Sequence, residues 1–374
     1  MPRPLFFLAV FAVLLGTGQA FAAPACTFAA PVCAARDAVY RISAYDPAAS
    51  AVRIAPTLLV TNRHVVADEA KATVYLETGE RIDARVLPTS FYGDLILLEA
   101  DLPPGPVLKP GGDASGSGVF TIGYDLATRS VMVNEPGLVL LAPDAGVPLA
   151  RLQHRAKSMA GNSGGALVDE DGELVGIATS GGDGRSEAIP ASAIDILKRE
   201  SGPAHSKESG RIGQAYRICD EALDDARRVR GALQEQISAT LEAECVAGGN
   251  KVQIELAAQA FGQRGDFDRS ITLFKRALAQ DPLSISTRLG LATTYHLAGR
   301  FADEVPLVRA LLDVIPEDPT LQRYAIQAGK WGDAPDLAAR GLELIRRYSP
   351  EQAAGAERFL ATDLPPPTSA PRLK

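Results

Sequence analysis

A change of residue pattern near position 211 constrains the fold of this chain more than any other feature. From about Ala38 to Ile196, short apolar runs such as "TLLVTN", "DLILLEA" and "GELVGIATS" alternate with Gly, Pro, Asn and Asp. Many short strands without helical periods between them favour an all-β barrel or sandwich. From Arg211 on, after a polar segment, the pattern is helical and rich in Ala, Leu, Glu and Arg. A chain of 374 residues is long enough for two domains, so we expect a β domain followed by a helical one.

The helical part contains an internal repeat. The stretch "AFGQRGDFDRSITLFKRALAQDP" aligns with "TYHLAGRFADEVPLVRALLDVIP" at an offset of 34 residues, which matches Gly265 with Gly299 and Phe267 with Phe301. This is the period of the tetratricopeptide helix-turn-helix repeat, and the segment resembles that family. A third, degenerate copy lies around "YAIQAGKWGDAPDLAARGLELIRRYSP". The alternative is an unrelated helical bundle.

The N-terminus reads as a targeting segment. Arg3 is followed by an apolar run that is too short to span a bilayer, and Ala20-Phe21-Ala22 fits a cleavage signal. We expect a signal peptide and a periplasmic or secreted product without a membrane span after cleavage; an uncleaved anchor is the alternative. The net charge of -7 gives no general attraction to nucleic acid.

Four cysteines in an exported chain suggest disulfides. Sequence proximity favours Cys26 with Cys33 and Cys219 with Cys245. The second pair would fasten an antiparallel helical hairpin that turns near Gly231, whereas one straight helix would hold the two sulfurs far apart. Two free buried thiols are the alternative. The spacings do not resemble a zinc site, and we expect no metal and no cofactor.

A serine lies among three glycines in "GNSGG", and its chemistry depends on finding a base. Of the four histidines, His205 falls in the polar segment and His296 in a helical repeat, while His154 reads as a packed strand residue. His64 follows the apolar strand in "TLLVTNRHVVAD". Asp94 opens the buried run in "GDLILLE", where an unpaired carboxylate would be costly. The order His64, Asp94, Ser163 therefore predicts a base, an orienting acid and a nucleophile.

The segments "TNRHVV", "GDLILLE" and "GNSGGAL" together resemble the catalytic motifs of trypsin-like serine proteases, most closely the bacterial Deg/HtrA branch. The resemblance covers about Ala38 to Ile196 and implies a fold of two antiparallel β-barrels. It implies an oxyanion hole made by the N–H groups of Gly161 and Ser163. It also implies that the strand "IATSGG", with Thr179, Ser180 and Gly181, binds the substrate backbone.

The same resemblance places Lys157 and Ser158 near the wall of the first substrate pocket. Lys157 would favour an acidic substrate side chain there, although a solvated lysine is the simpler interpretation.

Two features depart from the resemblance. The residue before the serine is Asn162 rather than the aspartate that pairs with a new N-terminus in animal trypsins, so no such activation is expected. Helical repeats also stand where the Deg/HtrA branch carries a PDZ domain, so its caged oligomer is not assumed.

The combined prediction is a multidomain protein, with an all-β two-barrel trypsin-like domain and an all-α tetratricopeptide-like domain. Its expected parts are a signal peptide at 1–22, the protease domain at 23–200, a linker at 201–211, the helical hairpin at 212–249, the repeats at 250–363 and a Pro-rich tail at 364–374. The predicted function is an exported serine endopeptidase that acts on polypeptides and binds a protein partner through its repeats. The alternatives are an inactive protease-fold scaffold and a tetratricopeptide adaptor.

Overall fold

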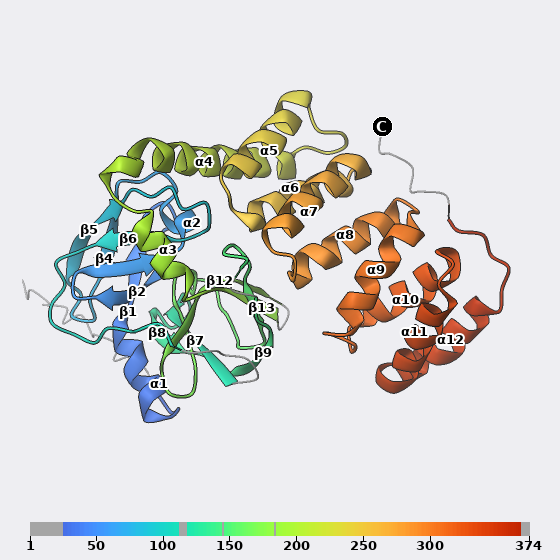
Figure 1. The fold of residues 1–374 in the computed structure, drawn as a ribbon, viewed down its shortest axis with the longest axis horizontal. Helices are drawn as coiled ribbons and strands as arrows, with labels where there is room; N and C mark the ends of the chain where they lie inside the picture. Colours follow the sequence, from blue (N-terminus) through green and yellow to red (C-terminus); the bar gives the residue numbers. More distant parts are fainter. Residues whose placement is uncertain (1–24, 112–117, 144–145, 183–184, 368–374) are drawn as a thin grey trace, which may run out of the picture.

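The computed structural model describes residues 25–111, 118–143, 146–182 and 185–367. The predicted signal peptide and residues 368–374 of the predicted tail lie outside these ranges. Figure 1 shows a β half, from blue to green, beside an elongated array of helices, from yellow to red.

The first half of the β region is a closed six-stranded barrel. Its strands are antiparallel and follow the order β1-β2-β3-β6-β5-β4. Apolar side chains at alternate strand positions fill its interior, among them Ile42, Leu59 and Leu98. The strands are β1 (Val39–Ser43), β2 (Ala49–Ala55), β3 (Leu58–Thr61), β4 (Lys71–Tyr75), β5 (Arg81–Leu87) and β6 (Ile96–Glu99).

A second barrel follows, and it confirms the predicted two-barrel architecture. Its sheet runs β11-β12-β13-β10-β9-β7-β8, and an additional β11–β7 pairing closes it into a ring. A shared core that includes Leu95, Ile122 and Ile177 packs between the two barrels. The strands are β7 (Gly118–Asp125), β8 (Ser130–Val133), β9 (Gly137–Leu141), β10 (Leu152–His154), β11 (Ala166–Val168), β12 (Leu174–Gly182) and β13 (Arg185–Pro190). The helices α1 (Ala30–Ala35) and α3 (Ala193–Arg199) precede and follow the barrels, and the short α2 (Arg63–Val66) follows β3.

The described residues after α3 are mainly helical, as predicted. They comprise α4 (Ser206–Arg228), α5 (Glu235–Ala247), α6 (Lys251–Gly262), α7 (Phe267–Gln280), α8 (Ile285–Leu297), α9 (Phe301–Leu312), α10 (Pro319–Trp331), α11 (Pro335–Tyr348) and α12 (Pro350–Leu360). The helices α6, α8 and α10 each begin 34 residues after the previous one, and so do α7, α9 and α11. The structure therefore contains three helix pairs with the period read from the sequence. That they belong to the tetratricopeptide family stays a prediction.

The boundary between the two halves differs from the expected linker. A 3-10 turn at Pro203–His205 leads directly into α4, which begins at Ser206, so about half of the segment 201–211 is helical. Its Ser and Gly residues suggested a flexible connection, but Glu208 and Arg211 form an ion pair one turn apart at 2.7 Å, which supports a helix on the surface.

Both cysteine pairs are disulfides in the structure. Cys219 of α4 and Cys245 of α5 are joined with a Cα–Cα distance of 4.8 Å, and the chain reverses between these helices through Gly231 at a φ of 86°. Cys26 and Cys33 are joined beside α1.

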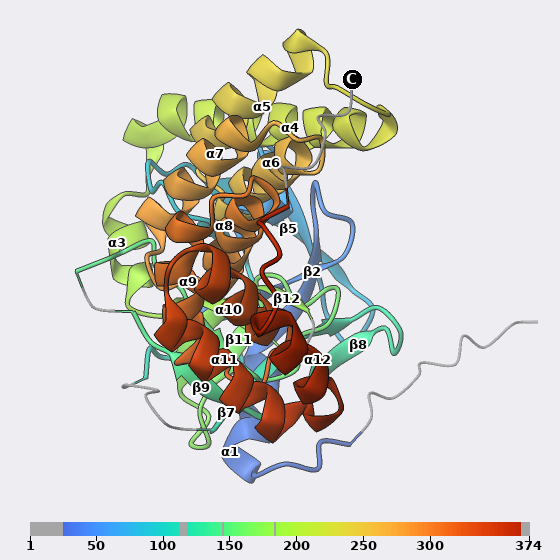
Figure 2. The same ribbon diagram turned by 90° about the vertical axis from the view of Figure 1, so that its right-hand side faces the viewer.

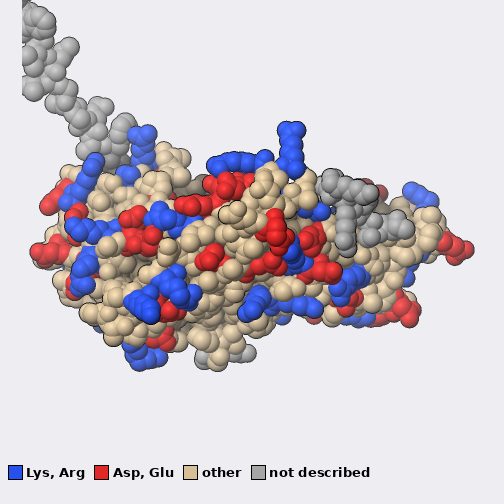
Figure 3. Space-filling view, turned by 90° about the horizontal axis from the view of Figure 1, so that it is seen from above, with Lys and Arg blue, Asp and Glu red and all other residues tan. Residues whose placement is uncertain are grey.

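The helical half lies along both barrels, with α4 across the first and the later helices beside the second (Figures 1 and 2). On the face seen in Figure 3, Lys and Arg side chains are interspersed with Asp and Glu, without a large area of one sign. Within the described residues, no helix combines the length and apolar character needed to cross a membrane.

Candidate active site

His64 and Asp94 meet because their strands are neighbours. Thr61, the last residue of β3, pairs with Ile96, the first residue of β6, in antiparallel register. His64 lies in α2, directly after β3, and Asp94 lies just before β6, so the two residues are close to each other. His64 Nδ1 is 2.8 Å from Asp94 Oδ2, and the backbone N–H of His64 donates to Asp94 Oδ1 at 2.9 Å. The carboxylate therefore fixes both the imidazole and the backbone that carries it.

The surroundings keep Asp94 ionised and the imidazole of His64 oriented. Asp94 is 4% exposed, and burial opposes its ionisation, but the His64 charge, the hydrogen bond from His64 and the Arg151 charge outweigh burial and lower the pKa of Asp94. Burial likewise disfavours the imidazolium, yet the charge of Asp94 and its hydrogen bond raise the pKa of His64 above its ordinary value. With Asp94 ionised, Nδ1 carries the proton and Nε2 is left as the acceptor.

Ser163 lies in the loop between β10 and β11, and Asn162 holds that loop in place. The buried Asn162 Oδ1 accepts hydrogen bonds from the N–H of Met159 at 2.8 Å and from Asn134 Nδ2 at 2.9 Å. Its Nδ2 donates to the carbonyl of Tyr124 at 3.1 Å. A neutral amide can both donate and accept, whereas an aspartate at this position would have no donor for the Tyr124 carbonyl.

The glycines around Ser163 meet a steric requirement. Gly161 and Gly164 have φ values of 95° and 80°, a region that favours glycine. A Cβ on Gly164 would lie 2.2 Å from the carbonyl oxygen of Ser50, so a larger residue would push the loop away from the first barrel.

The predicted oxyanion donors are available. Among the described residues, neither the N–H of Gly161 nor that of Ser163 donates a hydrogen bond. Two backbone amides without partners, two residues apart on a fixed loop, can stabilise a developing negative charge.

The Ser163 hydroxyl points toward β12 in this structure. Its Oγ donates to the carbonyl of Thr179 at 3.4 Å, and no hydrogen bond to His64 occurs within the described residues. The hydroxyl of Thr179, which sits at a bulge of β12, donates to Asp94 Oδ2 at 2.9 Å. Thr179 was predicted to bind substrate, and the structure places its side chain on Asp94.

Gly181 is packed closely against Ser158 and Ser186 at the predicted wall of the first substrate pocket. A Cβ on Gly181 would lie 2.7 Å from Ser158 Cβ and 2.8 Å from Ser186 Oγ. Lys157 is half exposed and lies 3.8 Å from Glu135, which fits the interpretation of a solvated lysine. The hydroxyl of Ser180 points into the protein and donates to Glu187 at 3.0 Å.

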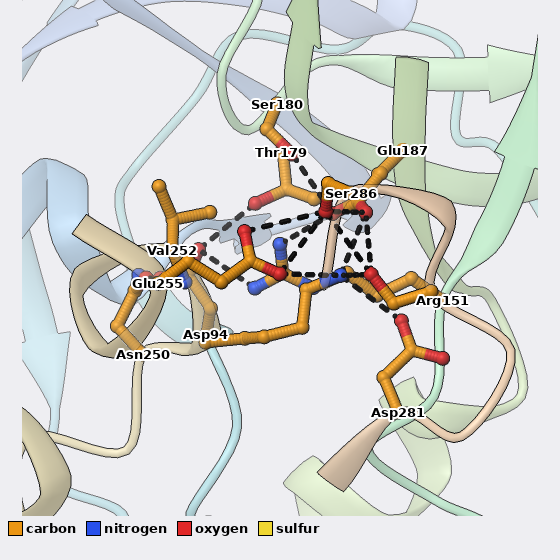
Figure 4. A network of polar contacts seen from close by, with 12 residues as sticks. Asp94, Arg151, Thr179, Ser180, Glu187, Asn250, Val252, Glu255, Asp281 and Ser286 are labelled. Atoms are coloured by element: carbon orange, nitrogen blue, oxygen red, sulfur yellow. Dashed lines mark hydrogen bonds and ion pairs between the residues drawn. The ribbon is translucent and has the colours of Figure 1, made fainter. Parts of the chain in front are cut away.

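A buried ion cluster behind Asp94 was missed by the sequence analysis. It consists of Arg151 and Glu187 from the second barrel and Lys251, Glu255 and Asp281 from the helical half. Arg151 Nη2 lies 4.0 Å from Asp94, and Arg151 Nη1 donates to Glu187 at 2.9 Å. Lys251 Nζ donates to Glu187 at 2.6 Å and to Asp281 at 3.1 Å. Figure 4 shows Asp94, Arg151, Glu187, Glu255 and Asp281 converging on one place.

Each member of this ion cluster is at most 7% exposed. Arg151 and Lys251 lower the pKa of Glu187 against the effect of its burial. No sequence motif marks these residues, because they come from distant segments and meet only after folding.

Ser50 of β2 is a second residue that sequence reasoning missed. Its N–H donates to the carbonyl of Ser163 at 2.8 Å, and its Oγ donates to the carbonyl of Gly161 at 2.7 Å. The first barrel therefore fixes the loop that carries the serine of the second barrel.

Comparison with known proteins finds similarity over the part of the chain that contains this site. Residues 49–177 match the model of the trypsin-like peptidase domain, and this range contains His64, Asp94 and Ser163. Serine protease HTRA1B of Danio rerio is 34% identical over 162 residues, which are 40% of this chain and 34% of that protein. The probable periplasmic serine endoprotease DegP-like of Pseudomonas fulva is 31% identical over 172 residues, covering 42% of this chain and 34% of its own.

The chain thus spans about a third of the length of these curated relatives. Among solved structures, the serine endoprotease from Yersinia pestis matches with a TM-score of 0.38 and 26% identity, over 45% of this chain and 64% of that chain.

Proposed function

We propose that this protein is a serine endopeptidase that hydrolyses peptide bonds through Ser163, His64 and Asp94. The observation that carries the proposal is the His64–Asp94 pair together with a loop that presents Ser163 and two backbone amides that have no partner within the described part of the chain. The similarity of residues 49–177 to the trypsin-like peptidase domain, and of the same region to named serine proteases, supports it.

The chemistry follows from the roles of these groups. A substrate carbonyl would lie against the N–H groups of Gly161 and Ser163, and Ser163 Oγ would turn from the Thr179 carbonyl toward His64 Nε2. His64 takes the hydroxyl proton as Oγ attacks, then gives it to the leaving amine, which yields an acyl-enzyme. Asp94 stabilises the imidazolium. Water then attacks the acyl group, with His64 again as base, and releases the product acid.

Labelling with an active-site phosphonate tests this proposal. The wild-type protein should be labelled on Ser163 and should cleave unfolded casein. Ser163→Ala and His64→Ala should each lower kcat by about 10⁴-fold or more, and the double variant should be little worse, because the triad acts as a unit. Ser192→Ala, at an exposed serine before α3, serves as the labelling control and should still react at Ser163.

The pH dependence gives an independent measurement. The neutral His64 is the base, so kcat/KM should rise with pH as His64 loses its proton and then level off. Because Asp94 raises the pKa of His64, the midpoint should lie above the ordinary value of about 6.5. A flat profile between about pH 5 and pH 9 would point to a different base.

Two other functions predict different results. An inactive scaffold would bind protein through its helices but would neither react with the phosphonate nor cleave casein. A tetratricopeptide adaptor would keep its partner binding when the whole β half is removed. We further propose that the protein is exported, and that the three helix pairs bind a protein partner or present substrates, since stacked helix pairs form a concave surface.

A further inference from the structure

A cavity of about 510 Å³ lies where the second barrel meets the helices. Ser180 and Gly181 of β12 form part of its wall, and the opposite wall comes from α6, α7 and α8. The cavity therefore begins one residue beyond Thr179, whose carbonyl accepts the hydrogen bond from Ser163. Its volume falls in the range of sites that bind small ligands or short peptide segments.

Glu255 of α6 supplies a buried carboxylate to this cavity. It is 6% exposed, and its oxygens accept hydrogen bonds from the hydroxyls of Thr287 and Ser286, the latter at 3.0 Å. Its one ion pair among the described residues is with Lys251, at 3.9 Å. Lys251 lies closer to Glu187, at 2.6 Å, and to Asp281, at 3.1 Å. The close partners of Glu255 are therefore neutral hydroxyls, and its nearest cation is more distant and is shared with two other carboxylates. Of the acids in the ion cluster, Glu255 has the negative charge that is least compensated.

The charge count supports this conclusion. The ion cluster contains three carboxylates and two cations, and the second cation, Arg151, is engaged by Glu187 and also lies near Asp94. The cavity wall has two other charged residues: Glu187 is paired with Arg151 and Lys251, and Arg185 is paired with Asp318 at 3.0 Å. Burial is the main reason that the pKa of Glu255 is raised, and the charge of Glu187 adds to it against the effect of Lys251. A further cation in the cavity would make the numbers of positive and negative charges in the ion cluster equal.

The remaining wall suits the stem of a long side chain. Val252, Phe274, Ile285, Leu289 and Leu297 contribute apolar surface around the same cavity. Lys and Arg combine an aliphatic stem with a charged end. Apolar walls with one carboxylate that lacks a close cation, Glu255, therefore fit them better than a short acid, an amide or a purely apolar group.

We propose that this cavity is a substrate subsite for a lysine or arginine side chain, with Glu255 of the helical half as its specificity-determining residue. The proposal rests on the proposed endopeptidase function, because it assumes that the substrate runs along β12 beside Ser163. It assigns the helices a direct part in substrate selection.

Peptides that differ at one position test the subsite. Fluorogenic peptides would carry lysine, or its uncharged isostere norleucine, at each successive position on either side of the scissile bond. For the wild-type protein we expect one position at which lysine raises kcat/KM over norleucine by about tenfold. In Glu255→Gln this ratio should fall to about one, and in Glu255→Asp, which keeps the charge, it should stay above the Gln value.

Matched controls separate this proposal from the general function. Glu343→Gln removes an exposed acid of α11 and should keep the wild-type ratio. Phosphonate labelling and the thermal midpoint would verify that each variant is folded. A protein that cleaves peptides with no position preferring lysine, or a Glu255→Gln variant that keeps the preference, overturns the subsite alone. A folded protein that neither reacts with the phosphonate nor cleaves any peptide overturns both proposals.

Discussion

Two ionic contacts between the helical half and the barrels differ in their burial. On the first barrel, Arg217 of α4 donates to Asp68 and to Glu69, the latter at 2.9 Å, while its guanidinium lies over the ring of Tyr45. These charged side chains are between 29% and 48% exposed. On the second barrel, Lys251 of α6 reaches Glu187 through the ion cluster, where both side chains are buried.

The two contacts differ in the free energy that is lost when they are broken. Water and salt ions solvate the charges of an exposed ion pair after it separates, so the net contribution of the pair to stability is small. A buried charge that loses its partner has no such replacement, and the remaining ion stays desolvated. We therefore expect the Lys251 contact with the second barrel to be strict and the Arg217 contact with the first to be permissive.

The largest effect is expected from Lys251→Met. This change keeps the aliphatic stem but leaves Glu187 and Asp281 facing each other with only Arg151 as a buried cation. We expect a loss of about 3 to 5 kcal/mol in unfolding free energy and a clear fall in kcat, because Arg151 links Glu187 to Asp94. Calorimetry and casein cleavage measure both. Lys275→Met, on the exposed face of α7, is the matched control; equal effects of the two variants would contradict a strict buried contact.

Removal of the disulfide of α4 and α5 should have an intermediate effect. The double change of Cys219 and Cys245 to Ala opens a loop with a sequence separation of 26, for which chain entropy gives about 3 kcal/mol. Removing Cys26 and Cys33 in the same way opens a separation of 7 and should cost about 2 kcal/mol. Thermal unfolding of both variants and of the wild-type protein under oxidising conditions measures the two losses of stability. A larger loss from the shorter loop would show that chain entropy does not determine the contributions of these disulfides.

The smallest effect is expected from Arg217→Ala. Its exposed pairs should contribute about 1 kcal/mol or less, and the difference from wild type should shrink as salt is added. Urea unfolding at low and high ionic strength measures this. A loss as large as that of Lys251→Met, and insensitive to salt, would remove the distinction between the two attachments.

The fold could be predicted from the sequence because each pattern that indicates it lies within a short, continuous stretch of the chain. The apolar alternation before position 196 predicted an all-β domain, and the 34-residue offset after it predicted paired helices. The two-barrel form of the β domain came from the resemblance of its three motifs to trypsin-like serine proteases. The two barrels and the helix pairs are present. The degenerate third copy is also a helix pair, and Asp333 has a positive φ of 55° at the position equivalent to Gly265 and Gly299. An aspartate tolerates this conformation better than most residues, so the turn persists without the glycine that would reveal it.

The site was predictable only in part. His64, Asp94 and Ser163 stand in recognisable motifs, and the structure brings His64 and Asp94 together. The support of Asp94 by Thr179 and Arg151 follows from a bulge in β12 and from the packing of β10, which no short motif encodes. Lys251 and Glu187 are far apart in sequence and belong to different domains, so their contact exists only in the folded protein.

The double attachment has a consequence for thermodynamic linkage. His64 and Asp94 belong to the first barrel and Ser163 to the second, and the helical half is fixed to both. A molecule that binds the helices and favours one spacing of the barrels would change the affinity of the candidate active site for its ligand. By reciprocity, a ligand of the candidate active site would change the affinity of the helices for that molecule by the same factor. A phosphonate bound to Ser163 would then change the affinity of the helices for the molecule that they bind, without touching the helices' binding site.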